Sequence, residues 1–153
     1  MTNAATIRCG VYAAISLAAL VATWSQNLAY TPGGSATMTT LRGPVELFRR
    51  FTLDTAITPA SRSITADIMM LFLAAAILMV LEARRHQIPF VWAYIAAGLV
   101  VAISVSFPLF LIARERRLAA QGSTTPSLGP LDTVLLTVLA VVAAAGTLWV
   151  DTR

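Results

Sequence analysis

The sequence predicts an all-α integral membrane protein, a bundle of four transmembrane helices with a short interfacial amphipathic helix between spans 1 and 2. The chain has 153 residues, of which 58% are hydrophobic and only 12% are charged, whereas soluble domains carry roughly 25% charged residues. Its mean hydropathy is +0.77. The apolar residues gather in four runs, each near the ~20 residues that a helix needs to cross a bilayer. We expect one transmembrane domain, residues 1–153, without a separate soluble domain.

The first predicted span covers about residues 11–30. Alanines at every fourth position, Ala14, Ala18 and Ala22, form a smooth face on which another helix can approach closely. A rival interpretation is a cleaved signal peptide, because Arg8 precedes the apolar core. We expect an uncleaved span.

The segment 44–54 has the pattern of an amphipathic helix. Apolar and charged residues alternate at helical spacing, and Pro44 suits a first helical turn. We expect this helix to lie in the headgroup region and to close one mouth of the bundle. Thr58 and Pro59 then form a helix start, with the threonine as N-cap and the proline in the first turn.

A charged turn joins the second span, about 62–83, to the third, about 89–113. A polar linker at 118–129 leads to the fourth span, about 130–150, where Gly146 contributes a second close-packing face. Four spans place both termini on one side of the membrane. The polar segments 31–63 and 113–129 hold seven arginines and the rest of the chain holds four, which favours termini on the outer side. Arg8, early in the chain, favours the opposite orientation, so both stay open.

Two carboxylates lie near the ends of the second span. Fourteen residues separate Asp67 from Glu82, and as helix they cover about 21 Å, less than the ~30 Å of hydrocarbon. We therefore expect Asp67, and less firmly Glu82, to face the bundle interior, where ionisable groups are often functional. The structural alternative pairs Asp67 with Arg62, and Glu82 with Arg85 or His86.

The third span carries a second polar feature. Pro108 removes one helix hydrogen bond and frees the carbonyl of Ser104, and Ser104 and Ser106 can satisfy the freed backbone groups. The functional alternative is a kink that opens a cavity or gate. No general base lies beside either serine in the sequence, so a serine nucleophile is not supported.

The residue types exclude several functions. His86 is the single histidine and Cys9 the single cysteine, so the sequence offers no set of metal ligands and no CxxC pair. We expect no catalytic residues, no metal and no cofactor. The net charge is +4, and the basic residues are spread over several segments. This balance fits anionic lipid headgroups and indicates no nucleic-acid partner.

Three segments resemble a known family: VELFRRFTLDTAI, SITADIMMLFLAAAILMVLEARRHQIP and VWAYIAAGLVVAISVSFPLFLIARER. The resemblance covers about residues 41–117 and is to small multi-span inner-membrane proteins of bacteria and cyanobacteria, classed only as a domain of unknown function. The matching positions are Glu46, Leu47, Phe48, Asp67, Glu82, Arg84, Arg85, Ser106, Pro108, Leu109, Phe110, Leu111, Arg114 and Glu115. The spacing from serine to proline and an arginine in place of an asparagine depart from the pattern. The resemblance implies a three-helix core, to which the fourth span is an addition, and it implies no activity.

Three functions compete. The leading one is an accessory or structural subunit of a membrane complex, which binds other membrane subunits or itself through its Ala and Gly faces within the lipid bilayer. The second is a small membrane enzyme or a lipid- or isoprenoid-binding protein with a pocket lined by Asp67. The third is a proton-coupled small exporter, which is ranked last because no span has a carboxylate at its centre. We expect a multi-pass location in the cell (inner or plasma) membrane.

Overall fold

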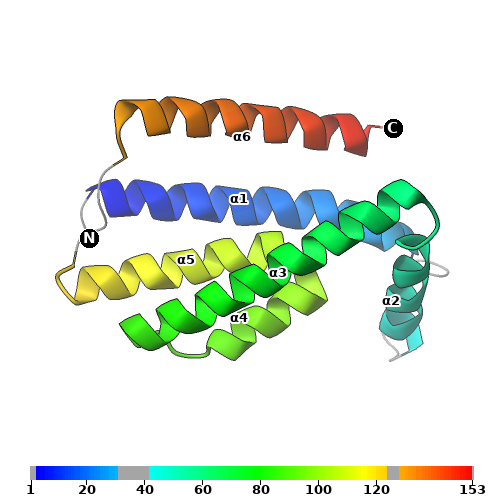
Figure 1. Ribbon diagram of the computed structural model, residues 1–153, viewed down its shortest axis with the longest axis horizontal. Helices are drawn as coiled ribbons and strands as arrows, with labels where there is room; N and C mark the ends of the chain where they lie inside the picture. The colour runs from blue at the N-terminus through cyan, green and yellow to red at the C-terminus, as the bar shows by residue number, and fades with distance from the viewer. Residues whose placement is uncertain (1–2, 31–41, 124–127, 153) are drawn as a thin grey trace.

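The computed structural model describes residues 3–30, 42–123 and 128–152, and within these residues it is helical and contains no strand. Four helical runs are long and apolar enough to cross a membrane, as the sequence predicts. Figure 1 shows how they are arranged. The elements are α1 (Asn3–Asn27), η1 (Leu28–Tyr30), α2 (Arg42–Asp54), α3 (Pro59–His86), α4 (Val91–Ala97), η3 (Gly98–Ala102), α5 (Ile103–Ala120) and α6 (Pro130–Asp151).

Helix α1 begins eight residues earlier than the predicted span, so Arg8 lies within it. The face of α1 that packs against α5 contains Ala5 and Ser16, which are buried. Ala14 and Ala18 are exposed. Ala22, the third alanine of the predicted face, is half-buried. Two of the three alanines are therefore left uncovered by the described part of this chain, and contact with a partner there stays a prediction.

Helix α2 forms where the amphipathic pattern predicts a helix, while its place in the headgroup region stays a prediction. It follows η1, and Tyr30 contacts Phe51 edge to face with ring centroids 6.1 Å apart. A hydrogen bond with the Asp54 carboxylate raises the pKa of Tyr30 above its usual value of 10.0. These contacts hold α2 across the end of α1 (Figure 1).

Helix α3 begins at the predicted cap. The amide of Ser61 donates to Thr58 Oγ1 at 3.0 Å, and the amide of Thr58 donates to Ser61 Oγ at 3.1 Å. Pro59 occupies the first turn, where its missing N–H leaves nothing unsatisfied. The helix ends at Gln87, which adopts a left-handed conformation (φ 56°).

The third apolar run, residues 91–120, folds back on itself. Ala102 is extended (φ 176°, ψ 146°) between the π-helical turn η3 and α5. The rings of Tyr94 and Phe110 lie 5.8 Å apart, although sixteen residues of straight helix would separate them by about 24 Å. Helices α4 and α5 therefore form an antiparallel hairpin (Figure 1). The break lies six residues before Pro108, and α5 continues through that proline.

The hairpin turns near the middle of the bundle. Its apex contacts Phe72 near the centre of α3, and Ser16, near the centre of α1, donates to the carbonyl of Val105 just after the apex. The open end of the hairpin, where α4 begins and α5 ends, therefore lies at the end of the bundle where α3 ends. As a result the termini lie at opposite ends of the molecule (Figure 1), whereas four straight spans would bring them to the same end. We name the end that carries the N-terminus and the turn at 87–90 the N-terminal end.

The core lies between α3 and the two arms of the hairpin. Its buried residues are Met79, Ala83, Ile88, Val91, Ile95 and Phe110. Helix α6 has no part in it, because none of the side chains described in this helix is buried. Gly146 has open space around it, since a Cβ added there would meet no atom within 4 Å.

Candidate functional site

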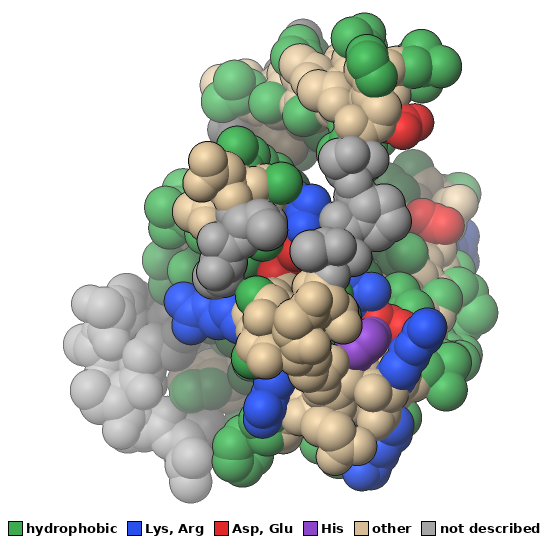
Figure 2. Space-filling view, turned by 90° about the vertical axis from the view of Figure 1, so that its left-hand side faces the viewer, with side chains coloured by type: hydrophobic (Ala, Val, Ile, Leu, Met, Phe, Trp, Pro, Cys, Tyr) green, Lys and Arg blue, Asp and Glu red, His purple; other side chains and the backbone are tan. Residues whose placement is uncertain are grey.

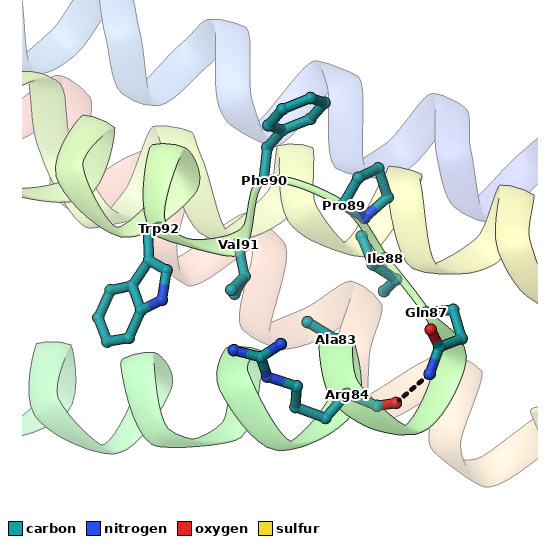
Figure 3. A pocket seen from close by; sticks show the side chains of 8 residues that line it. All are labelled: Ala83, Arg84, Gln87, Ile88, Pro89, Phe90, Val91 and Trp92. Atoms are coloured by element: carbon teal, nitrogen blue, oxygen red, sulfur yellow. Dashed lines mark hydrogen bonds between the residues drawn. The ribbon is translucent and has the colours of Figure 1, made fainter.

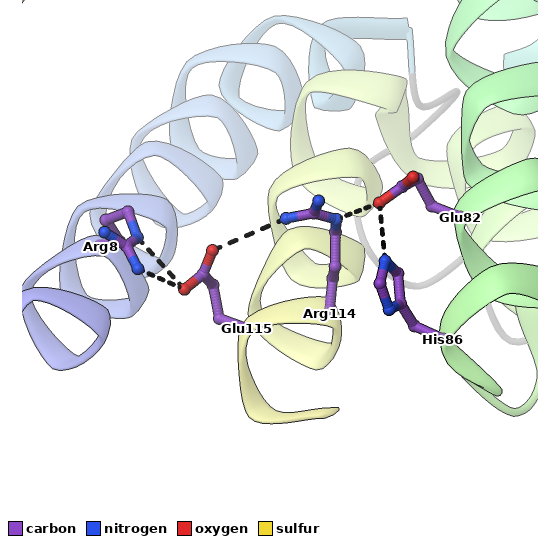
Figure 4. A network of polar contacts seen from close by, with 5 residues as sticks. All are labelled: Arg8, Glu82, His86, Arg114 and Glu115. Carbon is purple, nitrogen blue, oxygen red and sulfur yellow. Dashed lines mark hydrogen bonds and ion pairs between the residues drawn. The ribbon is translucent and has the colours of Figure 1, made fainter. Parts of the chain in front are cut away.

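Five charged or ionisable side chains form a chain of contacts across the N-terminal end (Figure 4). Its first link joins α1 to α5. Arg8 donates to Glu115 Oε2 from Nε at 3.1 Å and from Nη2 at 2.8 Å. The side chain of Glu115 is 4% exposed and that of Arg8 is 17% exposed. Burial removes competing water, so these are strong charge-assisted hydrogen bonds.

Arg114 is the central link. Its Nη1 lies 3.8 Å from Glu115 Oε1, and its Nε donates to Glu82 Oε2. His86, one turn further along α3, lies with Nε2 3.5 Å from the same Glu82 oxygen. Arg114 therefore connects α5 to α3, and through Glu115 to α1. The chain of contacts joins the three helices that surround the hairpin opening.

The formal charges of these side chains balance. Arg8 and Arg114 carry two positive charges, and Glu82 and Glu115 carry two negative charges. A buried ion pair offsets its desolvation cost only if each charge has a close partner, and here each does. The arrangement acts as an electrostatic clamp between helices, which we call the clamp.

A second polar group of residues lies at the hairpin apex. Ser16 Oγ donates to the carbonyl of Val105 at 3.0 Å. Ser106 is 1% exposed, and its Oγ has no hydrogen-bond partner among the described residues. A Cβ on Gly98 would lie 2.9 Å from that oxygen. Irregular backbone at membrane depth is tolerated where protein surrounds it, and here α1 and α3 surround the apex.

The residues predicted from the sequence are only partly brought together. Glu82 contacts His86, one of its two predicted partners, and Arg114, which was not predicted. Asp67 is exposed, so the expectation that it faces the interior is wrong. The hairpin turns at mid-bundle and leaves the Asp67 half of α3 uncovered. Arg62 and Ser104 are exposed, whereas Ser106 and Pro108 are buried.

Sequence reasoning missed the link between Arg8 and Glu115. The two residues are 107 positions apart, and no local pattern relates them. Arg114 and Glu115 belong to the motif that carries the family resemblance, which was the one available signal. That motif singled out Arg114 and Glu115 but did not indicate which side chains they contact.

One comparison identifies relatives. The family model described as "Protein of unknown function DUF2834" matches residues 11–116. No curated protein matches the chain, and no solved structure does. The match includes α3, the hairpin and most of α1, and it ends before α6.

Proposed function

This chain belongs to the DUF2834 family, and we propose that it is a non-catalytic accessory subunit that contributes helix contacts to a complex in the inner membrane of a bacterium. The resemblance to small bacterial inner-membrane proteins supports the location. A role without chemistry is supported by the clamp, because both of its carboxylates, of which only Glu115 is buried, already contact arginine side chains.

One observation carries the proposal. Helix α6 is 22 residues long and no side chain described in it is buried, whereas the rest of the bundle is joined by the core and the clamp. Ala143 and Gly146 are small residues three positions apart, which places them on one face of the helix, and both are exposed. Small side chains offer little contact area to lipid, but they allow the backbone of a neighbouring helix to approach closely. The face around Gly146 therefore suits a helix of another membrane subunit.

The other two functions have less support. A proton-coupled exporter needs a carboxylate that can bind and release a proton. Glu82 and Glu115 instead both form ion pairs with arginines. A pocket lined by Asp67 lacks an opposite wall, because the hairpin does not reach that half of α3.

The test is the isolation of the protein from native membranes in mild detergent, with a substitution that reports on α6. Gly146→Leu fills the proposed contact face without touching this chain, since a Cβ there meets nothing within 4 Å. Val141→Leu is the matched control, because it lies five residues away, about 140° around the helix. We expect a stoichiometric partner that Gly146→Leu releases at least tenfold and Val141→Leu retains. A wild-type protein that elutes as a lone monomer would refute the proposal.

A further inference from the structure

The turn at 87–90 is flanked by two surface grooves at the N-terminal end. One lies on the α3 side, beside Arg84 and Trp92 (Figure 3). The other has a volume of about 440 Å³ and lies between the turn and α5. We call the second one the Phe90 groove. It is lined by apolar side chains that include Phe90, Tyr94, Leu109 and Ile112, and by Arg116 and Arg117.

The groove lies at a level that suits the boundary between headgroups and acyl chains. Phe90 is 80% exposed and Trp92 is 65% exposed, and exposed aromatic side chains concentrate at membrane interfaces. Arg117 lies eight positions after Leu109 on the helix, so the groove follows α5 for about 12 Å. This is long enough for the upper part of one acyl chain, with the arginines at headgroup level.

The end of the molecule around the groove carries uncompensated positive charge. Glu82 and Glu115 are held by Arg8 and Arg114, and of the four arginines outside the clamp only Arg85 also has an electrostatic interaction with Glu82. Those arginines are Arg84, Arg85, Arg116 and Arg117; all four are exposed, and they form no hydrogen bond or salt bridge with the described residues. Figure 2 shows arginine side chains around this end of the molecule.

The turn that forms one wall is held in a strained conformation. Phe90 has φ 59°, which is unfavourable for a bulky residue. The turn is fixed by the amide of Ile88, which donates to the carbonyl of Ala83 at 2.9 Å, and by Gln121 Nε2, which donates to the carbonyl of His86 at 3.2 Å. Strained residues of this kind cluster at ligand clamps. Here the strain presents the Phe90 ring at the edge of the groove.

We propose that the Phe90 groove binds an anionic phospholipid of the surrounding leaflet. Arg116 and Arg117 hold the phosphate, and one acyl chain lies against Tyr94, Leu109 and Ile112. Charge complementarity favours an anionic headgroup, and the apolar floor favours a lipid over free phosphate. This end holds six of the eleven arginines, against four in α2 and the start of α3 and one at the C-terminus, so it faces the cytoplasmic leaflet.

The test measures thermal stabilisation of the detergent-solubilised full chain by added phosphatidylglycerol, with phosphatidylcholine of the same acyl chains as the comparison lipid. The variant is Arg116→Gln/Arg117→Gln, whose side chains are exposed, so the fold is retained. The control is Arg49→Gln/Arg50→Gln, which removes the same charge from the other end of the bundle. Each arginine near a phosphate is worth about fivefold in lipid affinity, so we expect the variant to bind phosphatidylglycerol about 25-fold more weakly and the control to bind normally.

Two further measurements distinguish a phospholipid from a free phosphate as the ligand. Glycerol phosphate and inorganic phosphate, added alone, should give no stabilisation and should not compete with phosphatidylglycerol. Equal stabilisation by the two lipids would overturn the proposal, as would equal loss in the two double variants. Stabilisation by inorganic phosphate alone would replace the lipid with a free anion and would equally overturn it.

Discussion

Replacement of Glu115 by leucine tests the clamp at its most buried point. The Glu115 carboxylate is 4% exposed and accepts two hydrogen bonds from Arg8. Glu115→Leu leaves the Arg8 guanidinium, itself 17% exposed, at the same place without its carboxylate. The change removes the ion pair between α1 and α5, while Arg114 keeps its contact with Glu82 and Ser16 keeps its hydrogen bond to Val105.

The expected magnitude follows from burial. Breaking a buried ion pair by removing one partner costs about 3–5 kcal/mol, whereas replacing both partners by apolar residues is often neutral or stabilising. We therefore expect Glu115→Leu and Arg8→Leu each to lower the free energy of unfolding by about 3–5 kcal/mol. The double variant Arg8→Leu/Glu115→Leu should lie within about 1 kcal/mol of the wild type.

The measurement is equilibrium unfolding of the purified chain in mixed micelles, followed by helical circular dichroism. The four proteins form a double-mutant cycle, which isolates the coupling between the two side chains. A control variant, Asp67→Asn, changes an exposed carboxylate of α3 outside the clamp and should leave the unfolding midpoint of the bundle unchanged. If the double variant loses the sum of the two single losses, Arg8 and Glu115 are not coupled and the clamp described above is wrong.

Three other predictions are independent of the clamp. Because the hairpin folds back at mid-bundle, reporter fusions at the two termini should map to opposite sides of the membrane, and a shared side would contradict the fold-back. Gly98→Ala places a Cβ 2.9 Å from both Phe72 Cε2 and Ser106 Oγ, so we expect it to destabilise the bundle by about 1–3 kcal/mol. The same unfolding assay should show no such loss for the control Gly146→Ala. Equal losses in the two variants would contradict the close packing at the hairpin apex. The guanidiniums of Arg49 and Arg50 lower the pKa of Glu46 from 4.5 to about 2. The stabilisation of α2 by these ion pairs is therefore present above pH 4.5 and is lost as the pH falls through about 2. In Arg49→Gln/Arg50→Gln, carboxyl NMR titration should return a Glu46 pKa near 4.5, and an unchanged pKa would contradict the assigned cause.

The sequence by itself determined the features that depend on neighbouring residues. Four long apolar runs predicted four helices, since a backbone in hydrocarbon must satisfy its hydrogen bonds internally. Thr58 and Pro59 predicted the start of α3, because an N-cap and a first-turn proline act on amides within one turn. The amphipathic period predicted α2. The motif around Arg114 and Glu115 indicated the family that the comparison confirms.

The tertiary structure alone decided how these helices meet. Lipid-facing and helix-facing residues are both apolar in a membrane, so the hydropathy of residues 91–120 is the same for a straight span and for a hairpin. The fold-back at Ala102 is set by packing of Phe110 against Tyr94 and of Gly98 against Phe72. That choice placed the termini at opposite ends, left Asp67 exposed and brought Arg8 to Glu115 across 107 positions. Contacts at such separations depend on the path of the whole chain, and no local pattern encodes them.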